Sequence, residues 1–150
     1  MPSKKNLDKT YLDMAKRWSE LSPAVRKKVG CLIVKDNAII SDGYNGTPAG
    51  FDNKCEDYVD SHHMLASRAY KLVTKPEVLH AETNAITKLA KSTQSSVGST
   101  MYTTASPCLD CAKLIIQSGI SRVVYSELYK NKDGINLLLK AKIKVDECKI

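Results

Sequence analysis

Two short motifs constrain this chain more than any other feature. The first is His80-Ala81-Glu82, and the second, after the intervening residues 83 to 106, is Pro107-Cys108-Leu109-Asp110-Cys111. One imidazole and two thiolates can fill three positions of a tetrahedral Zn²⁺ and leave the fourth for water. Zinc lowers the pKa of such a water from about 15.7 to about 7. We therefore expect a fold that brings His80, Cys108 and Cys111 together.

Glu82 stands two residues from His80, too close for both side chains to be expected on one ion. A carboxylate beside the metal can instead accept and return protons as a general acid–base group. The plain alternative is a first-turn acid that stabilises the helix dipole. We favour the catalytic role because the metal motif flanks this residue.

The cysteine pattern has two further interpretations. Five cysteines are an odd number, and no secretion signal precedes them, which argues against a disulfide framework. A Cys-x-x-Cys pair alone is also typical of a redox site or of half a zinc ribbon. A ribbon needs a second Cys pair, which the chain lacks, and a thioredoxin-like site needs neither His80 nor Glu82.

Length and charge set broader limits. We expect 150 residues to form one catalytic domain, 1–150, with a proper core. No apolar run approaches the ~20 residues of a membrane span, and no apolar stretch follows the basic start, so we expect a cytoplasmic protein and no membrane partner. The net charge of +7 favours an anionic partner, either a phosphorylated small molecule or a nucleic acid.

Hydrophobic periodicity predicts the element order α-β-β-α-β-α-β-α-β. Helices are expected over residues 7–21, from 80 onward, over 108–118 and over 135–140. Strands are expected over residues 29–34, 38–40, 100–104, 123–125 and 143–145, with a glycine-rich loop over 43–50 and a polar insert over 51–79 that contains a helix over 56–72. This alternation indicates an α/β fold, a sheet covered by helices whose later strands are parallel.

Several longer segments are distinctive, namely V-G-C (29–31), G-Y-N-G-T-P-A-G (43–50), H-A-E-T-N-A-I (80–86) and S-P-C-L-D-C-A-K (106–113) with I-Q-S-G-I (116–120). These segments resemble those of the deoxycytidylate (dCMP) deaminases of the cytidine deaminase superfamily. The metal motif is common to the superfamily, whereas the loop and Asn84 point to the dCMP branch. The resemblance implies a single-domain, three-layer α/β/α fold with a mixed five-stranded sheet. It also implies zinc-dependent hydrolysis of dCMP to dUMP and ammonia, which feeds dTMP synthesis.

The resemblance implies roles for residues around the metal. Water would attack carbon 4 of cytosine, while Glu82 moves protons to ring N3 and to the leaving amine. We expect Arg26 to contact the phosphate and Asn45 to contact the sugar 3′-hydroxyl. Backbone near Ala81 and Ser106 would hold the base edges, and Tyr125 or Tyr129 would cover the base face. The alternatives are a solvated surface side chain for Arg26, an ordinary turn residue for Asn45 and core packing for Tyr125.

Many members of this family are homo-oligomers, often hexamers. Many are activated by dCTP and inhibited by dTTP, with Mg²⁺ on the triphosphate. If this chain is regulated, we expect the effector to contact Gly43, Tyr44, Gly46, Asn84, Lys88 and Lys91. Glycines let backbone N–H groups approach phosphates. Interface packing and a solvated helix face are the alternatives for these residues.

Other classes of protein share parts of this sequence pattern. A deaminase of polymeric nucleic acid fits the charge, but Trp18 and Phe51 are the only Trp and Phe, so we expect no nucleic-acid partner. Free cytidine deaminases usually have Cys where His80 stands, and the deaminases of riboflavin synthesis lack the loop. A non-catalytic zinc module would not need Glu82.

Cys55, His62 and His63 suggest a second zinc, but three ligands do not complete a tetrahedral site.

Overall fold

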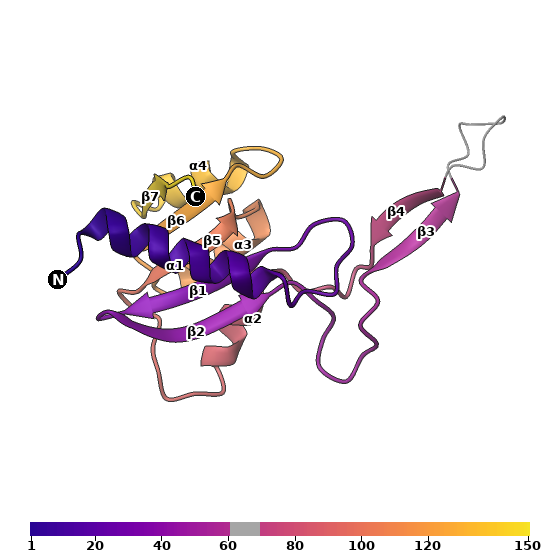
Figure 1. Cartoon of the computed structure of the whole chain (residues 1–150), viewed down its shortest axis with the longest axis horizontal. Coiled ribbons are helices and arrows are strands. Elements are labelled where there is room, and N and C mark those ends of the chain that lie inside the picture. Colours follow the sequence, from indigo (N-terminus) through magenta and orange to yellow (C-terminus); the bar gives the residue numbers. More distant parts are fainter. Residues whose placement is uncertain (61–69) are drawn as a thin grey trace.

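A computed structural model of the chain describes residues 1–60 and 70–150. Figure 1 shows a central sheet with helices on both faces and a separate ribbon that projects from it. The helices are α1 (Lys4–Ser19), α2 (Ala81–Leu89), α3 (Leu109–Gln117) and α4 (Asp133–Lys140). The strands are β1 (Gly30–Lys35), β2 (Ala38–Tyr44), β3 (Glu56–Asp60), β4 (Tyr70–Thr74), β5 (Thr100–Ala105), β6 (Arg122–Glu127) and β7 (Lys144–Glu147).

The five-stranded sheet has the order β2-β1-β5-β6-β7. β1 runs antiparallel to both β2 and β5, whereas β5, β6 and β7 are parallel. Asp36 and Asn37 make the tight turn between β1 and β2 with φ angles of 51° and 61°. Positive φ at both central residues matches the right-handed twist of the flanking strands. The prediction of a mixed sheet with parallel later strands is confirmed.

Alternate residues of β1 face opposite helix layers. Leu32 and Val34 pack in the cluster that contains Leu12 and Ala15 of α1. Cys31 and Ile33 belong to the cluster formed with α2, α3 and α4. This alternation follows from the two-residue period of a strand. It places α1 on one face and the other three helices on the opposite face (Figure 1), as the α/β/α expectation requires.

The insert departs from the sequence-based expectation. The helix predicted over 56–72 is wrong, because β3 and β4 form an antiparallel pair from Glu56↔Thr74 to Asp60↔Tyr70. Short alternating segments such as Asp57-Tyr58-Val59 suit a ribbon with two faces. The pair projects away from the sheet (Figure 1). β2 also extends to Tyr44, so the glycine-rich loop begins two residues later than expected.

Two glycines permit the close approaches that place the site. A Cβ on Gly43 would lie 2.4 Å from the carbonyl oxygen of Ala81, so β2 can meet the start of α2 only without a side chain there. A Cβ on Gly134 would lie 2.0 Å from the carbonyl oxygen of Pro107. The start of α4 is thereby held against the segment that leads into α3. Among the described residues, the helices are too short or too polar to cross a membrane.

Candidate active site

The two sequence motifs meet at the N-termini of neighbouring helices. His80 is the N-cap of α2, and Cys108 is the N-cap of α3. His80 Nδ1 lies 3.3 Å from Cys111 Sγ and 3.5 Å from Cys108 Sγ. One ligand atom from each of these three residues lies within 4.8 Å of the others. The fold therefore assembles the predicted cluster from segments some thirty residues apart.

The ionisation of the two thiols favours a cation at this cluster. Hydrogen bonds from Cys111 and then His80 lower the pKa of the Cys108 thiol, which favours its thiolate form. The hydrogen bond with Cys108, together with burial, raises the pKa of Cys111. A second thiolate needs compensating positive charge. A divalent ion supplies that charge, and one imidazole with two sulfurs is the donor set of a zinc site that keeps an open position. These three residues fit Zn²⁺.

Glu82 lies beside this cluster. Its side chain is buried, with Oε2 at 3.3 Å from Cys111 Sγ and Oε1 accepting a hydrogen bond from Thr103 at 3.0 Å. Burial raises the pKa of the Glu82 carboxyl, against the lowering effect of its hydrogen bonds and of His80. A carboxyl group with a raised pKa can both accept and release a proton near neutral pH.

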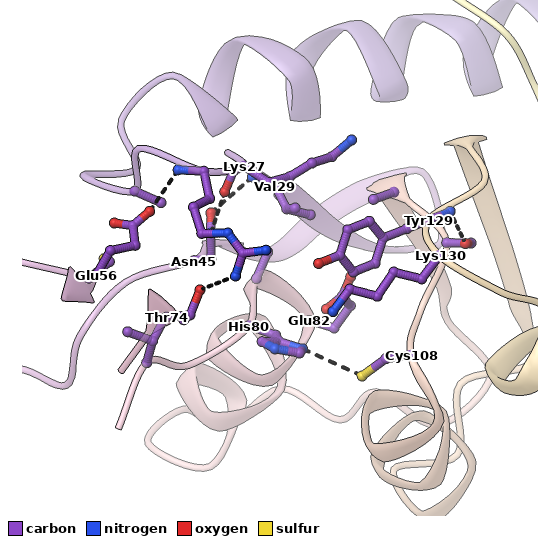
Figure 2. Close-up of a pocket in the computed structure, with 17 residues that line it drawn as sticks. Lys27, Val29, Asn45, Glu56, Thr74, His80, Glu82, Cys108, Tyr129 and Lys130 are labelled. Atoms are coloured by element: carbon purple, nitrogen blue, oxygen red, sulfur yellow. Dashed lines mark hydrogen bonds between the residues drawn. The ribbon is translucent and has the colours of Figure 1, made fainter. Parts of the chain in front are cut away.

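A cavity of about 240 Å³ opens over His80 and Glu82 (Figure 2). Its lining combines His80, Cys108 and Glu82 with four residues expected to contact a substrate, Arg26, Asn45, Ala81 and Ser106, whereas Cys111 is not in the lining. Tyr125 is 8% exposed on β6 and is not part of this lining. Tyr129 does line the cavity, together with Lys130, on the side of Cys108 (Figure 2).

The polar groups of the expected substrate residues differ in how far they are engaged. The exposed Arg26 donates from Nη1 to Thr74 Oγ1 at 3.4 Å. Asn45 accepts from the Val29 N–H at 2.9 Å and donates to the Lys27 carbonyl at 2.7 Å. The amide of Asn45 keeps one further N–H and one lone pair for a ligand.

Ser106 is buried in the lining of the cavity. Its N–H donates to the Glu127 carbonyl at 2.9 Å, and its hydroxyl accepts from the Tyr129 N–H at 2.8 Å. Ser106 therefore fixes the segment that brings Tyr129 and Lys130 to the cavity.

The sequence interpretation missed one whole wall of the cavity. The lining also includes residues of the insert, namely Cys55, Glu56, Thr74 and Val78. No local pattern marks these residues, because they reach the site through contacts between segments distant in sequence. Lys27, which lies before β1, also lines the cavity, where its ammonium pairs with Glu127.

A second cavity, of about 370 Å³, lies at the glycine-rich loop. It brings together Gly43, Tyr44, Gly46, Asn84 and Lys88, whereas Lys91 is not in its lining. Asn84 Nδ2 donates to the Tyr44 carbonyl at 2.8 Å, and Lys88 forms an ion pair with Asp42. The main chain links both cavities, since Gly46 pairs with Leu79, the residue before His80.

His62 and His63, considered above for a second zinc, lie outside the described residues. Cys55, the third residue of that set, is buried and lines the catalytic cavity.

A mixed sheet between helix layers, with a His–Cys–Cys cluster and a buried glutamate at two helix N-termini, defines a zinc-dependent deaminase. The profile of the "Cytidine and deoxycytidylate deaminase zinc-binding region" matches residues 5–127. The chain belongs to this family of cytidine and deoxycytidylate deaminases.

Relatives and a solved structure agree with this assignment. A deoxycytidylate deaminase of Enterobacteria phage T4 is 37% identical over 87% of this chain and 83% of its own length. A deoxycytidylate deaminase of Homo sapiens is 42% identical over 69% of this chain and 54% of its own length. A crystal structure of the dCMP deaminase from cyanophage S-TIM5, in complex with dCMP and dUMP, superposes with a TM-score of 0.82 at 38% identity. That match covers 97% of this chain and 99% of the phage protein.

Proposed function

We propose that this chain catalyses the hydrolytic deamination of dCMP to dUMP with release of ammonia. The observation that carries the proposal is that His80, Cys108 and Glu82 line the same cavity, of about 240 Å³. Similarity to the dCMP deaminase crystallised with dCMP and dUMP supports this substrate. The product dUMP is the precursor of dTMP.

His80, Cys108 and Cys111 would hold the zinc, which when bound supplies Lewis acidity toward water and the base. Glu82 would accept a proton from the attacking water and deliver it to ring N3. It would then pass the second water proton to the exocyclic amine. The bond from carbon 4 to that nitrogen breaks, ammonia leaves, and the uracil carbonyl remains. Burial of Glu82 raises the pKa of its carboxyl, which suits a group that both accepts and releases a proton.

The cations of the cavity suit a 5′-monophosphate. Arg26, Lys27 and Lys130 all line it, and the Lys130 ammonium lies 5.2 Å from the centroid of the Tyr129 ring. Arg26 would grip phosphate oxygens with its guanidinium fork. Asn45 would use its remaining donor and acceptor at the sugar hydroxyl, while backbone near Ala81 and Ser106 would hold the base edges. Tyr129, which lines the cavity, would cover the base face, whereas Tyr125 is not in the lining.

Ammonia release from dCMP tests the proposal, with CMP, deoxycytidine and a single-stranded oligonucleotide as parallel substrates. Turnover of dCMP in preference to the other three supports it. An inert dCMP together with a deaminated oligonucleotide would assign the site to nucleic-acid editing instead. A cytoplasmic location belongs to the proposal, because the thiols at 108 and 111 need a reducing compartment.

Regulation forms a second part of the proposal, with dCTP as activator and dTTP as inhibitor, each carrying Mg²⁺. The second cavity supports it, because five of the six expected effector residues, Gly43, Tyr44, Gly46, Asn84 and Lys88, lie in its lining. Lys91 would act only from outside that lining. The family resemblance implies a homo-oligomer, and a hexamer is the form we propose.

Two measurements test regulation. Rates of dCMP turnover with dCTP or dTTP plus Mg²⁺ should move in opposite directions, and sedimentation should give the mass of a hexamer. Rates that ignore both triphosphates would remove the regulatory part and leave the dCMP reaction intact.

A further inference from the structure

We propose that Glu56 is a positioning residue that holds residues 22–29 in the shape that presents Arg26 and Lys27 to the substrate. The insert that carries β3 and β4 is then part of the active site. This inference rests on the proposed dCMP reaction and names a residue that the reaction itself does not require.

The segment from Ser22 to Val29 has no helix or strand, so other groups must satisfy its backbone. The Ser22 hydroxyl accepts from the Ala24 N–H and donates to the Asn45 carbonyl at 3.2 and 2.7 Å. Asn45 binds the Lys27 carbonyl and the Val29 N–H. These side chains hold the two ends of the segment.

Glu56 holds the middle of the segment. Its Oε2 accepts from the Val25 N–H at 2.8 Å and from the Arg26 N–H at 2.6 Å. Two successive backbone N–H groups that converge on one anion form a strong binding arrangement. The side of the cavity opposite Cys108 is made by Glu56 and Thr74 (Figure 2).

Glu56 and Thr74 act on the same residue. They face each other in the register of β3 and β4, and Thr74 Oγ1 accepts from the Arg26 guanidinium at 3.4 Å. The base of the ribbon therefore contacts both the backbone and the side chain of Arg26. These contacts place the ribbon at the end of the cavity where Arg26 is proposed to bind the phosphate.

Glu56 is buried, and its contacts with the substrate segment compensate the charge of its carboxylate. The residue is 4% exposed, and none of the ion pairs formed by the described residues includes it. A buried carboxylate is costly unless hydrogen bonds compensate it. The two N–H groups of the substrate segment provide this compensation, so the carboxylate and the segment stabilise each other.

Loss of Glu56 should therefore weaken substrate binding and spare the chemical step. Glu82 and the metal ligands lie on α2 and α3 or at their N-caps, and Glu56 contacts neither helix through any hydrogen bond of the described residues. We expect Glu56→Ala to raise KM for dCMP at least about tenfold, since small misplacements of binding groups are costly. We expect kcat and zinc content to stay unchanged, and dUMP to bind more weakly by the same factor as KM rises.

Conservative variants separate position from charge. Glu56→Gln keeps an oxygen at the same distance along the side chain, so its KM for dCMP should lie close to the wild-type value. Glu56→Asp keeps the charge on a shorter stem, cannot reach both N–H groups well, and should resemble Glu56→Ala. Asp57→Ala is the matched control, because Asp57 is exposed and points to the opposite face of β3. It should behave as wild type.

The steady-state constants, dUMP affinity and zinc content of the full chain decide the matter. A wild-type KM in Glu56→Ala or Glu56→Asp, or an equal loss of kcat with unchanged dUMP affinity, would overturn the inference. If Glu56→Ala does not fold, the KM values of Glu56→Gln and Glu56→Asp still decide, because the inference requires the lower KM in Glu56→Gln. A wild-type protein inert toward dCMP would instead refute the proposed function.

Discussion

The hydroxyl of Thr103 lies 3.0 Å from Oε1 of Glu82 and 2.9 Å from the carbonyl oxygen of Ala105. A hydroxyl carries one proton, so Thr103 donates fully to only one of these oxygens at a time. It donates to Glu82 when the carboxylate is ionised. When the carboxyl is protonated, Thr103 can donate to Ala105 and accept from Glu82. Thr103 thus serves both states of a proton carrier.

We predict that Thr103→Val lowers kcat by about tenfold, because a hydrogen bond to a charged group is worth roughly 1.5 kcal/mol or more. KM for dCMP and zinc content should not change. Thr103→Ser retains the hydroxyl and serves as the control. A valine variant with the kcat of wild type would show that Thr103 only fills space.

Glu82→Gln should keep the metal and lose turnover. The substitution preserves the shape of the side chain but removes its ability to carry a proton. The expected loss of kcat is at least about 100-fold, within the range for general acid–base groups. Metal analysis and ammonia release from the same sample check both halves. Substantial remaining turnover would assign proton transfer to another group.

Asp8 and Arg122 join α1 to the sheet far from the catalytic site. Arg122 donates from Nη1 and Nη2 to the two carboxylate oxygens of Asp8 at 2.8 and 2.7 Å, and the Tyr102 hydroxyl donates at 2.7 Å. Burial alone would raise the pKa of Asp8, but the hydrogen bonds of Arg122 and Tyr102 outweigh it and lower the pKa. A depressed carboxyl pKa makes folding stability depend on pH.

We predict that Asp8→Asn lowers the free energy of unfolding by about 2 kcal/mol at neutral pH. The contribution of Asp8 is fully present above its unfolded pKa of about 3.9 and is lost as the pH falls through the lower folded value. The difference between wild type and Asp8→Asn should therefore shrink below about pH 4. Urea unfolding of both proteins across this range measures it. A difference independent of pH would contradict this account.

The metal site should also depend on Gly134. An alanine Cβ would lie 2.0 Å from the Pro107 carbonyl and 2.8 Å from that of Cys108, so the backbone must move. We predict that Gly134→Ala destabilises the fold by at least about 1–3 kcal/mol and weakens zinc retention against a chelator. The exposed Asn136→Ala on the same helix is the control. Unchanged zinc retention would show that α4 can shift without moving Cys108.

The sequence predicted the sheet and the metal cluster because their signals are local. The turn at Asp36 and Asn37, the apolar strands and the caps at His80 and Cys108 each specify their own segment. The ribbon departs from the predicted helix because it projects from the core. Apart from Glu56 at its base, its described side chains are exposed or half-buried, so they are not under the burial constraint that makes periodicity readable.

The role of Glu56 could not be predicted for a different reason. Its two partners lie about thirty residues earlier in the chain, and all the contacts are to backbone. A backbone N–H is present in every residue except proline, so the amino-acid types of Val25 and Arg26 do not reveal the hydrogen bonds. Likewise, only the three-dimensional fold shows that Tyr129 lines the cavity and Tyr125 does not.

Reversible removal of zinc tests the central claim most directly. The protein would be stripped with a chelator and assayed for dCMP deamination before and after addition of one equivalent of Zn²⁺. The account predicts that turnover disappears with the metal and returns with it in wild type, while Glu82→Gln binds zinc again without regaining turnover. A metal-free protein that still deaminates dCMP at the wild-type rate would contradict the account.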